Sequence, residues 1–94
     1  MPPKTIAQHH ADSVFAEGIA NNVTVVCMEK KEWYFTFDVP HPITGEQETF
    51  AIETQRGVLR TWADPRNLIN FLKTRYFLDE AKLTFEDESN GKSK

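Results

Sequence analysis

The chain has 94 residues, of which 39% are hydrophobic and 12% aromatic, and its formal net charge is −3. This length supports one domain with a modest core, and the single cysteine, Cys27, excludes an intramolecular disulfide. No apolar run is long enough to cross a bilayer, and the N-terminal residues lack the apolar core of a signal peptide. We therefore predict a single compact domain over residues 1–86, a disordered polar tail over 87–94, and a cytoplasmic protein without membrane contact.

The first predicted element is a helix over residues 5–22. Thr5 and Gln8 have the spacing of a capping box and follow two prolines that cannot sit inside a helix. An apolar stripe at three- and four-residue spacing then supports an amphipathic helix, through Ala7, Ala11, Val14, Phe15 and Ile19. Asn21 and Asn22 suit the end of the helix, because asparagine tolerates a left-handed conformation.

Four strands are predicted next, over residues 22–28, 33–39, 47–54 and 58–62. The clearest alternates along its length, with Trp33, Phe35 and Phe37 on one face and Tyr34 on the other, where it is the one strong candidate for an exposed aromatic residue. The connections are short and contain turn residues such as Gly57, which favours an antiparallel meander. We expect the helices to cover the face of the sheet that carries Trp33, Phe35, Phe37, Phe50 and Ile52.

A second helix is predicted to begin at Asp64, a good N-cap, with Pro65 in the first helical position. Its apolar face would consist of Leu68, Ile69, Phe71, Leu72 and Tyr76. A short strand over 81–87 follows, with Leu83 and Phe85 on one side. The fold class is therefore α+β, with an N-terminal helix, a four-stranded antiparallel meander, a second helix and a short C-terminal strand.

Charge is distributed unevenly along the chain. Residues 32–54 carry five carboxylates and no lysine or arginine, whereas residues 55–76 carry five cations against Asp64, a net charge of +4. A local basic segment attracts an anionic partner even when the whole chain is acidic. The candidate binding residues in and beside this segment are Arg56, Arg60, Arg66, Asn70, Lys73 and Arg75. The alternative is that these cations pair with the protein's own carboxylates, such as Asp64 and Glu53.

The remaining polar motifs favour neither catalysis nor a cofactor. His9 and His10 are adjacent, and neighbouring side chains on a helix point about a hundred degrees apart, so they are poorly placed to bind one metal ion. His10 and Ser13 lie within reach of each other but lack an orienting carboxylate or an oxyanion donor. His41 lies between two prolines in a predicted loop. We therefore predict a protein that is not an enzyme and binds no metal or cofactor.

Residues 50–87 contain three predicted elements in succession: a basic hairpin strand "RGVLRTW", the helix "DPRNLINFLKTRYF" and the strand "AKLTFED". This arrangement resembles small accessory proteins of bacterial plasmids and other mobile elements, including partition-associated proteins of the ParC type. The resemblance implies an accessory protein that acts through a partner protein or DNA, without catalysis. The N-terminal helix and the "PHPITGE" loop have no counterpart in it.

Two functions remain open from the sequence. The first is a small non-catalytic interaction or regulatory protein from a mobile element, which acts through protein–protein contact. An open sheet edge near 23–28 or 82–86 would allow a homodimer. The alternative is a nucleic-acid-binding accessory module that uses the basic segment 56–75 to contact DNA.

Overall fold

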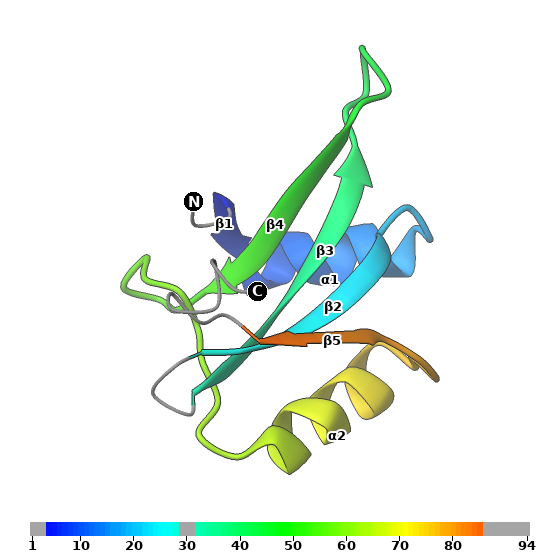
Figure 1. The fold of residues 1–94 in the computed structure, drawn as a ribbon. Helices are drawn as coiled ribbons and strands as arrows, with labels where there is room; N and C mark the ends of the chain where they lie inside the picture. Colours follow the sequence, from blue (N-terminus) through cyan, green and yellow to red (C-terminus); the bar gives the residue numbers. More distant parts are fainter. Residues whose placement is uncertain (1–3, 29–31, 86–94) are drawn as a thin grey trace, which may run out of the picture.

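The computed structural model describes residues 4–28 and 32–85, which form an α+β fold with two helices and one five-stranded mixed sheet (Figure 1). The elements are β1 (Lys4–Ala7), α1 (Gln8–Ala16), β2 (Asn21–Cys27), β3 (Trp33–Pro40), β4 (Gln47–Glu53), α2 (Pro65–Arg75) and β5 (Lys82–Phe85). The strand order is β1-β4-β3-β2-β5. The three central strands are antiparallel, whereas β1 is parallel to β4 and β5 is parallel to β2.

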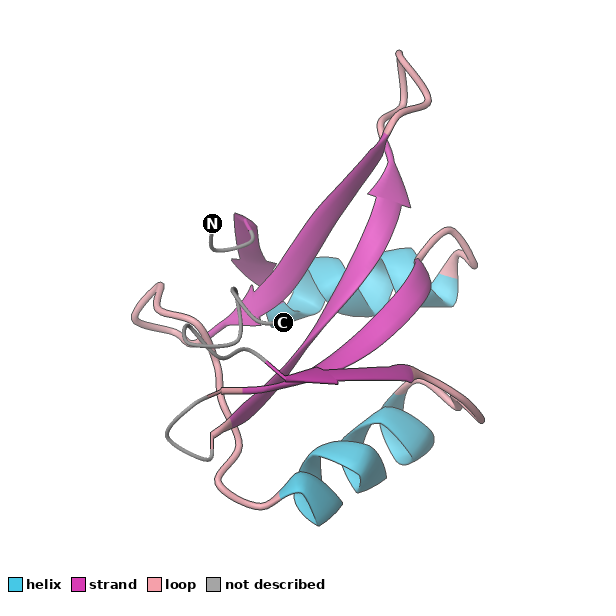
Figure 2. Cartoon of the chain, in the orientation of Figure 1, coloured by secondary structure: helices cyan, strands magenta, loops and turns pink. Residues whose placement is uncertain are grey.

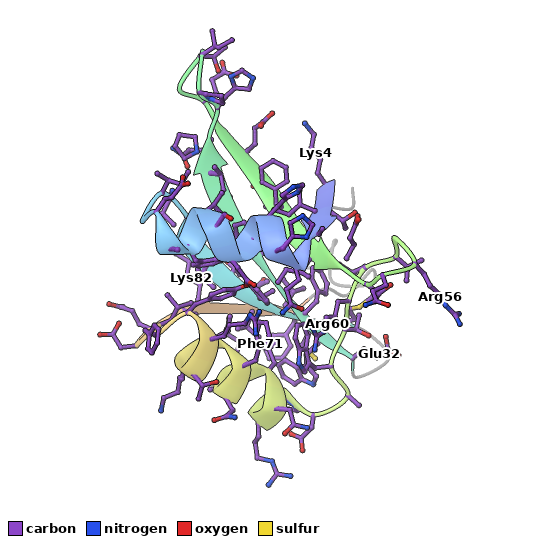
Figure 3. All side chains as sticks on the ribbon, turned by 180° about the vertical axis from the view of Figure 1, so that it is seen from behind. Lys4, Glu32, Arg56, Arg60, Phe71 and Lys82 are labelled. Carbon is purple, nitrogen blue, oxygen red and sulfur yellow. The ribbon has the colours of Figure 1, made fainter. Side chains whose placement is uncertain are left out.

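Both helices pack on the same face of the sheet, which Figure 3 shows from the helix side. The core between them contains Ala11 of α1 and Leu68 and Leu72 of α2, all nearly inaccessible to water. The sheet contributes Val25, Phe35, Phe37 and Ile52, among others, to this core. The prediction that the tryptophan and phenylalanines of β3 and the apolar residues of β4 face the helices is confirmed.

The three central strands follow the predicted pattern, but the four-stranded meander is wrong because residues 58–62 do not form a strand. β3 and β4 pair between Phe37–Pro40 and Gln47–Phe50 and then diverge. Residues 59–62 run between the diverging ends, where Leu59 bridges to Glu53 and Trp62 bridges to Trp33. The outer side of β4 is taken by β1, so this segment becomes a connection across the sheet toward α2 (Figure 2).

The predicted start of the first helix at Thr5 is also wrong, because Lys4–Ala7 is the edge strand β1. The Thr5 hydroxyl donates to Glu53 Oε1 at 2.9 Å instead of capping a helix. Ile6 lies opposite Ile52 in the β1–β4 register and packs against the core. The pairing of Ile6 with Ile52, at the side of β4 that β3 does not occupy, therefore outweighs the local capping pattern of Thr5 and Gln8.

The first helix also ends earlier than predicted. Glu17 is its C-cap, and Gly18 follows with φ +78°, the left-handed conformation that glycine adopts without strain. Ile19 therefore lies outside the helix and is 39% exposed. Asn22 does adopt a left-handed φ of 54°, but it does so inside β2, where the pairing with β3 shifts register between Asn21 and Thr24.

The second helix is confirmed, including its start. Asp64 has extended backbone geometry, and its Oδ1 accepts a hydrogen bond from the Arg66 backbone N–H at 2.9 Å. Leu68 and Leu72 are buried as expected. Ile69, which was predicted to lie on the apolar face, is instead 48% exposed and faces the space between α2 and β5.

Neither of the described helices covers the opposite face of the sheet, yet its central residues are buried. Tyr34 is 5% exposed and packs in a small cluster with Val26 and Ala51, flanked by Met28 and Leu59. The prediction of Tyr34 as an exposed aromatic side chain is therefore wrong. Leu59 belongs to the segment that connects β4 to α2. This segment lies between the diverging ends of β3 and β4 and therefore helps to cover this face of the sheet.

The predicted tail over residues 87–94 lies outside the described residues. Within residues 4–28 and 32–85, no helix is long and apolar enough to span a membrane.

Candidate functional site

The six predicted binding residues do not gather into one basic surface. They are distributed over the turn after β4, the connecting segment and four positions along α2. Figure 3 shows Arg56 pointing away from the body of the protein, whereas Arg60 lies beside Phe71, next to the two helices. The residues therefore have to be considered separately, according to what each one contacts.

Arg75 joins the end of α2 to α1. Its Nε and Nη2 donate to Asp12 Oδ1 and Oδ2 at 2.9 and 2.6 Å, and the Tyr76 hydroxyl donates to Asp12 Oδ1 at 2.7 Å. The hydrogen bond from Arg75 lowers the pKa of the Asp12 carboxyl below its usual range, and the same contact raises the pKa of the guanidinium. Burial, followed by the hydrogen bond to Asp12, raises the pKa of the Tyr76 phenol. These three residues form a network that holds the helices together.

Arg60 forms a second link to α1. Its Nη1 donates to Gln8 Oε1 at 2.7 Å, and its guanidinium carbon lies 4.6 Å from the centre of the Trp62 ring and 5.3 Å from that of Phe71. Its backbone N–H donates to the Ile52 carbonyl at 2.9 Å, which fixes the connecting segment on β4. An arginine that stacks on aromatic rings keeps its in-plane donors available for other partners.

Arg66 is engaged locally. Its guanidinium donates to both carboxylate oxygens of Asp64, at 3.2 and 3.0 Å, while the side chain is 89% exposed. This hydrogen bonding lowers the pKa of the Asp64 carboxyl and raises the pKa of the Arg66 guanidinium. The positive charge near the N-terminus of α2 is therefore compensated by the residue that caps the same helix.

Arg56, Asn70 and Lys73 are exposed, as are Arg66 and Arg75, but they differ from those two in their contacts. Their side chains form no ion pair with any residue of the described chain. Asn70 accepts a hydrogen bond from the Thr74 hydroxyl through its backbone carbonyl, at 2.8 Å. Lys73 lies at the rim of an apolar groove. Three of the five cations thus have partners within the chain, and a role for the segment in DNA binding stays a prediction.

A polar cleft of about 700 Å³ lies where the start of α1, the end of β4 and the end of α2 meet. Its charged lining consists of Asp12, Glu53, Arg60 and Arg75, and the start of α1 adds Gln8 and His9. The cleft therefore contains two of the predicted arginines. It also contains Glu53, which the sequence offered as an internal partner for these cations, and Asp12 and Gln8, which it did not, because they lie far from the arginines in the sequence.

An apolar groove of about 450 Å³ lies on the other side of α2, between that helix and β5. Its apolar lining includes Trp33, Ile69, Leu72, Leu78 and Leu83, and Lys73, Asp79, Glu80 and Lys82 supply charges. All four residues of β5 are exposed. Among the described strands, β5 is paired on one side only, with β2. This surface was signalled in the sequence by the alternation of Leu83 and Phe85.

The histidines are arranged in a way that does not assemble a nucleophile. The Ser13 hydroxyl donates to the backbone carbonyl of His9 at 3.2 Å, which is an interaction within α1. The His9 and His10 rings contact each other, with centroids 4.2 Å apart. His41 Nδ1 accepts hydrogen bonds from the backbone N–H groups of Ile43 and Thr44 at 3.1 and 3.3 Å, so it shapes the β3–β4 turn. In the part of the chain that is described, no three His, Cys, Asp or Glu residues form a group able to hold a metal ion.

Comparison of the chain with protein-family models, with curated proteins and with solved structures finds no match in any of the three.

Proposed function

We propose that this chain is a small non-catalytic interaction protein of a bacterial mobile element, which works in the cytoplasm through contact with another protein chain. The surface that would make this contact consists of the β5 edge and the adjoining α2–β5 groove. The observation that carries the proposal is the exposure of β5, where Leu83 is 57% and Phe85 62% exposed. The mobile-element origin rests on the resemblance of residues 50–87 to partition-associated proteins.

An edge strand presents backbone N–H and C=O groups that can pair with a further strand. The other predicted edge, near residues 23–28, is not one, because β2 lies between β3 and β5 in the sheet. β5 meets the requirement, because among the described strands it has a neighbour on one side alone. Strand addition at this edge is a recognised way to bind a protein segment, in which backbone hydrogen bonds supply affinity and apolar side chains supply specificity.

The occupant we assign is β5 of a second copy, in antiparallel orientation about a twofold axis. Leu83 is opposite Val25 in the β2–β5 register, so Leu83 and Phe85 lie on the helix-bearing face of the sheet. Pairing centred on Thr84 places Leu83 against Phe85 of the second copy on that face and the two Thr84 side chains against each other on the opposite face. Apolar pairs and Thr–Thr pairs both stabilise antiparallel strands.

The groove beside β5 provides the additional contact area that a four-residue strand lacks. It is lined mainly by apolar side chains, and its rim carries both signs of charge, with Lys73 and Lys82 near Asp79 and Glu80. A mixed rim is compatible with a copy of itself, because a twofold axis can bring unlike charges together. Exposed Ile69 extends the same apolar surface along α2.

Sedimentation equilibrium at micromolar concentrations tests the proposal. We expect the wild-type chain to have twice its 10.8 kDa mass. Leu83→Asp should have the mass of one chain, because it places a charge in the centre of the interface. The matched control is Ile43→Asp, which changes an 87% exposed apolar residue at the β3–β4 turn and should remain dimeric.

Far-UV circular dichroism should show the same secondary structure for all three proteins. A monomeric wild-type chain at these concentrations would rule out self-association as the function of this edge. A Leu83→Asp variant that remains folded and dimeric would instead place the interface on another surface.

A further inference from the structure

The polar cleft contains an arginine whose hydrogen-bonding capacity is only partly used. Within the described residues, Gln8 is the one side chain that accepts from the Arg60 guanidinium, and it contacts Nη1. The donors on Nε and Nη2 have no partner in that part of the chain. The cleft volume of about 700 Å³ is within the range of sites for small molecules.

The orientation of Arg60 is fixed in advance of any ligand. Trp62 and Phe71 lie against its guanidinium, at 4.6 and 5.3 Å from their ring centres, and Gln8 holds one nitrogen at 2.7 Å. The side chain is only partly exposed. Three contacts on a long side chain remove most of its conformational freedom, so less entropy is lost when the remaining donors bind a partner.

The charges that line the cleft differ in how well they are compensated. Arg75 is paired with Asp12 through two hydrogen bonds, so this pair contributes little net charge. Glu53 accepts a hydrogen bond from the Thr5 hydroxyl at 2.9 Å and has no cation as a partner among the described residues. Arg60 has no carboxylate partner there either. The cleft thus offers one guanidinium with free donors and one carboxylate with a free oxygen.

We propose that the cleft binds a small polar molecule through a single carboxylate group, which Arg60 holds with two parallel N–H···O bonds. A carboxylate matches the planar donor fork of a guanidinium. Glu53, which lines the same cleft, disfavours a second negative charge on the ligand and favours hydroxyl or amine donors. This site is separate from the β5 edge and does not depend on the oligomeric state.

The test uses acetate as the probe for the carboxylate and inorganic phosphate as the competing anion, both at constant ionic strength. NMR titration of the full chain should show saturable shifts of the Arg60 Nε–H and the Gln8 side-chain amide with acetate, with a dissociation constant on the order of 10 mM. Phosphate should bind at least a few-fold more weakly. Arg60→Lys, which keeps the charge but removes the fork, should weaken acetate binding about tenfold.

Two further variants test the proposal even if Arg60→Lys alters the fold. Arg56→Lys, in the exposed turn of the same segment, should leave acetate binding unchanged. Glu53→Gln removes a nearby negative charge while keeping an acceptor for Thr5, and should tighten acetate binding roughly two- to threefold. Shifts that do not saturate, tighter binding of phosphate, or no change on Glu53→Gln would each overturn the proposal.

Discussion

Helix α2 separates two hollows of opposite character. The polar cleft on one side is lined by charged residues, two of which, Asp12 and Arg75, form an ion pair. The groove on the other side is lined mainly by apolar residues and opens onto the exposed strand β5. On the polar side, arginines bind other side chains of the same chain, whereas on the other side apolar residues remain exposed.

The difference follows from what each side of α2 lies against. On the polar side, α1 presents Gln8 and Asp12 within reach of Arg60 and Arg75, so the arginines link the two helices. On the apolar side there is no second helix among the described residues; four-residue β5 leaves Ile69 exposed, and its own Leu83 is exposed as well. Two cations of the basic segment, Arg60 and Arg75, thus bind side chains of α1, while the surface that we propose to bind a second copy is mainly apolar.

The largest expected effect comes from removing the buried anchor of α2, on which both hollows depend. Leu68→Ala should lower the free energy of unfolding by about 2–5 kcal/mol, because it deletes a fully buried side chain and leaves a cavity. Ile69→Ala, one residue further on but 48% exposed, should cost less than about 1 kcal/mol. Urea denaturation measures both. Equal losses would mean that α2 is not oriented as described.

A smaller effect is expected on the polar side. Asp12→Asn should lower the free energy of unfolding by about 1 kcal/mol at pH 7, because it removes the charge that pairs with Arg75. The cost is modest because the Asp12 and Arg75 side chains remain 33% and 44% exposed. Urea denaturation at pH 7 provides the measurement, and Glu46→Gln in the exposed β3–β4 turn is the control.

The pH dependence of the free energy of unfolding distinguishes the loss of the ion pair from other effects of Asp12→Asn. Folding lowers the pKa of Asp12, so its contribution is complete above the unfolded pKa of about 4 and is lost as the pH falls through the folded pKa. The difference between wild type and variant should therefore shrink between pH 7 and pH 3. A difference that is the same at both values would exclude the ion pair as its cause.

The smallest effect should come from the exposed pair on α2 itself. Arg66→Gln should leave the thermal midpoint unchanged within error, because its guanidinium is in water and the Asp64 cap is retained through the backbone N–H of residue 66. Differential scanning calorimetry alongside Arg75→Gln provides the comparison. If both variants lower the midpoint equally, the distinction between a local pair and a link between helices would not hold.

Features with determinants close together in the chain were predicted well. The start of α2 was read from Asp64 and Pro65, and the direction of the β3 side chains from the alternation in 33–39. Of the candidate residues, the sequence named the arginines and offered the nearby Asp64, which is the partner of Arg66, but it did not identify the partners of Arg60 and Arg75. Asp12 lies 63 residues from Arg75, and Gln8 lies 52 residues from Arg60. No local sequence pattern connects residues so far apart.

The sequence by itself determined an α+β domain, its second helix, its three central strands and the alternation that leaves Leu83 and Phe85 on one side of β5. These follow from local backbone preferences and apolar periodicity. Only the tertiary structure decided that residues 4–7 pair with β4, that residues 58–62 become a connection, and that Arg60 and Arg75 have partners on α1. Edge pairing and the pairing of Arg60 and Arg75 depend on groups distant in sequence, whose proximity exists only once the sheet and helices have packed.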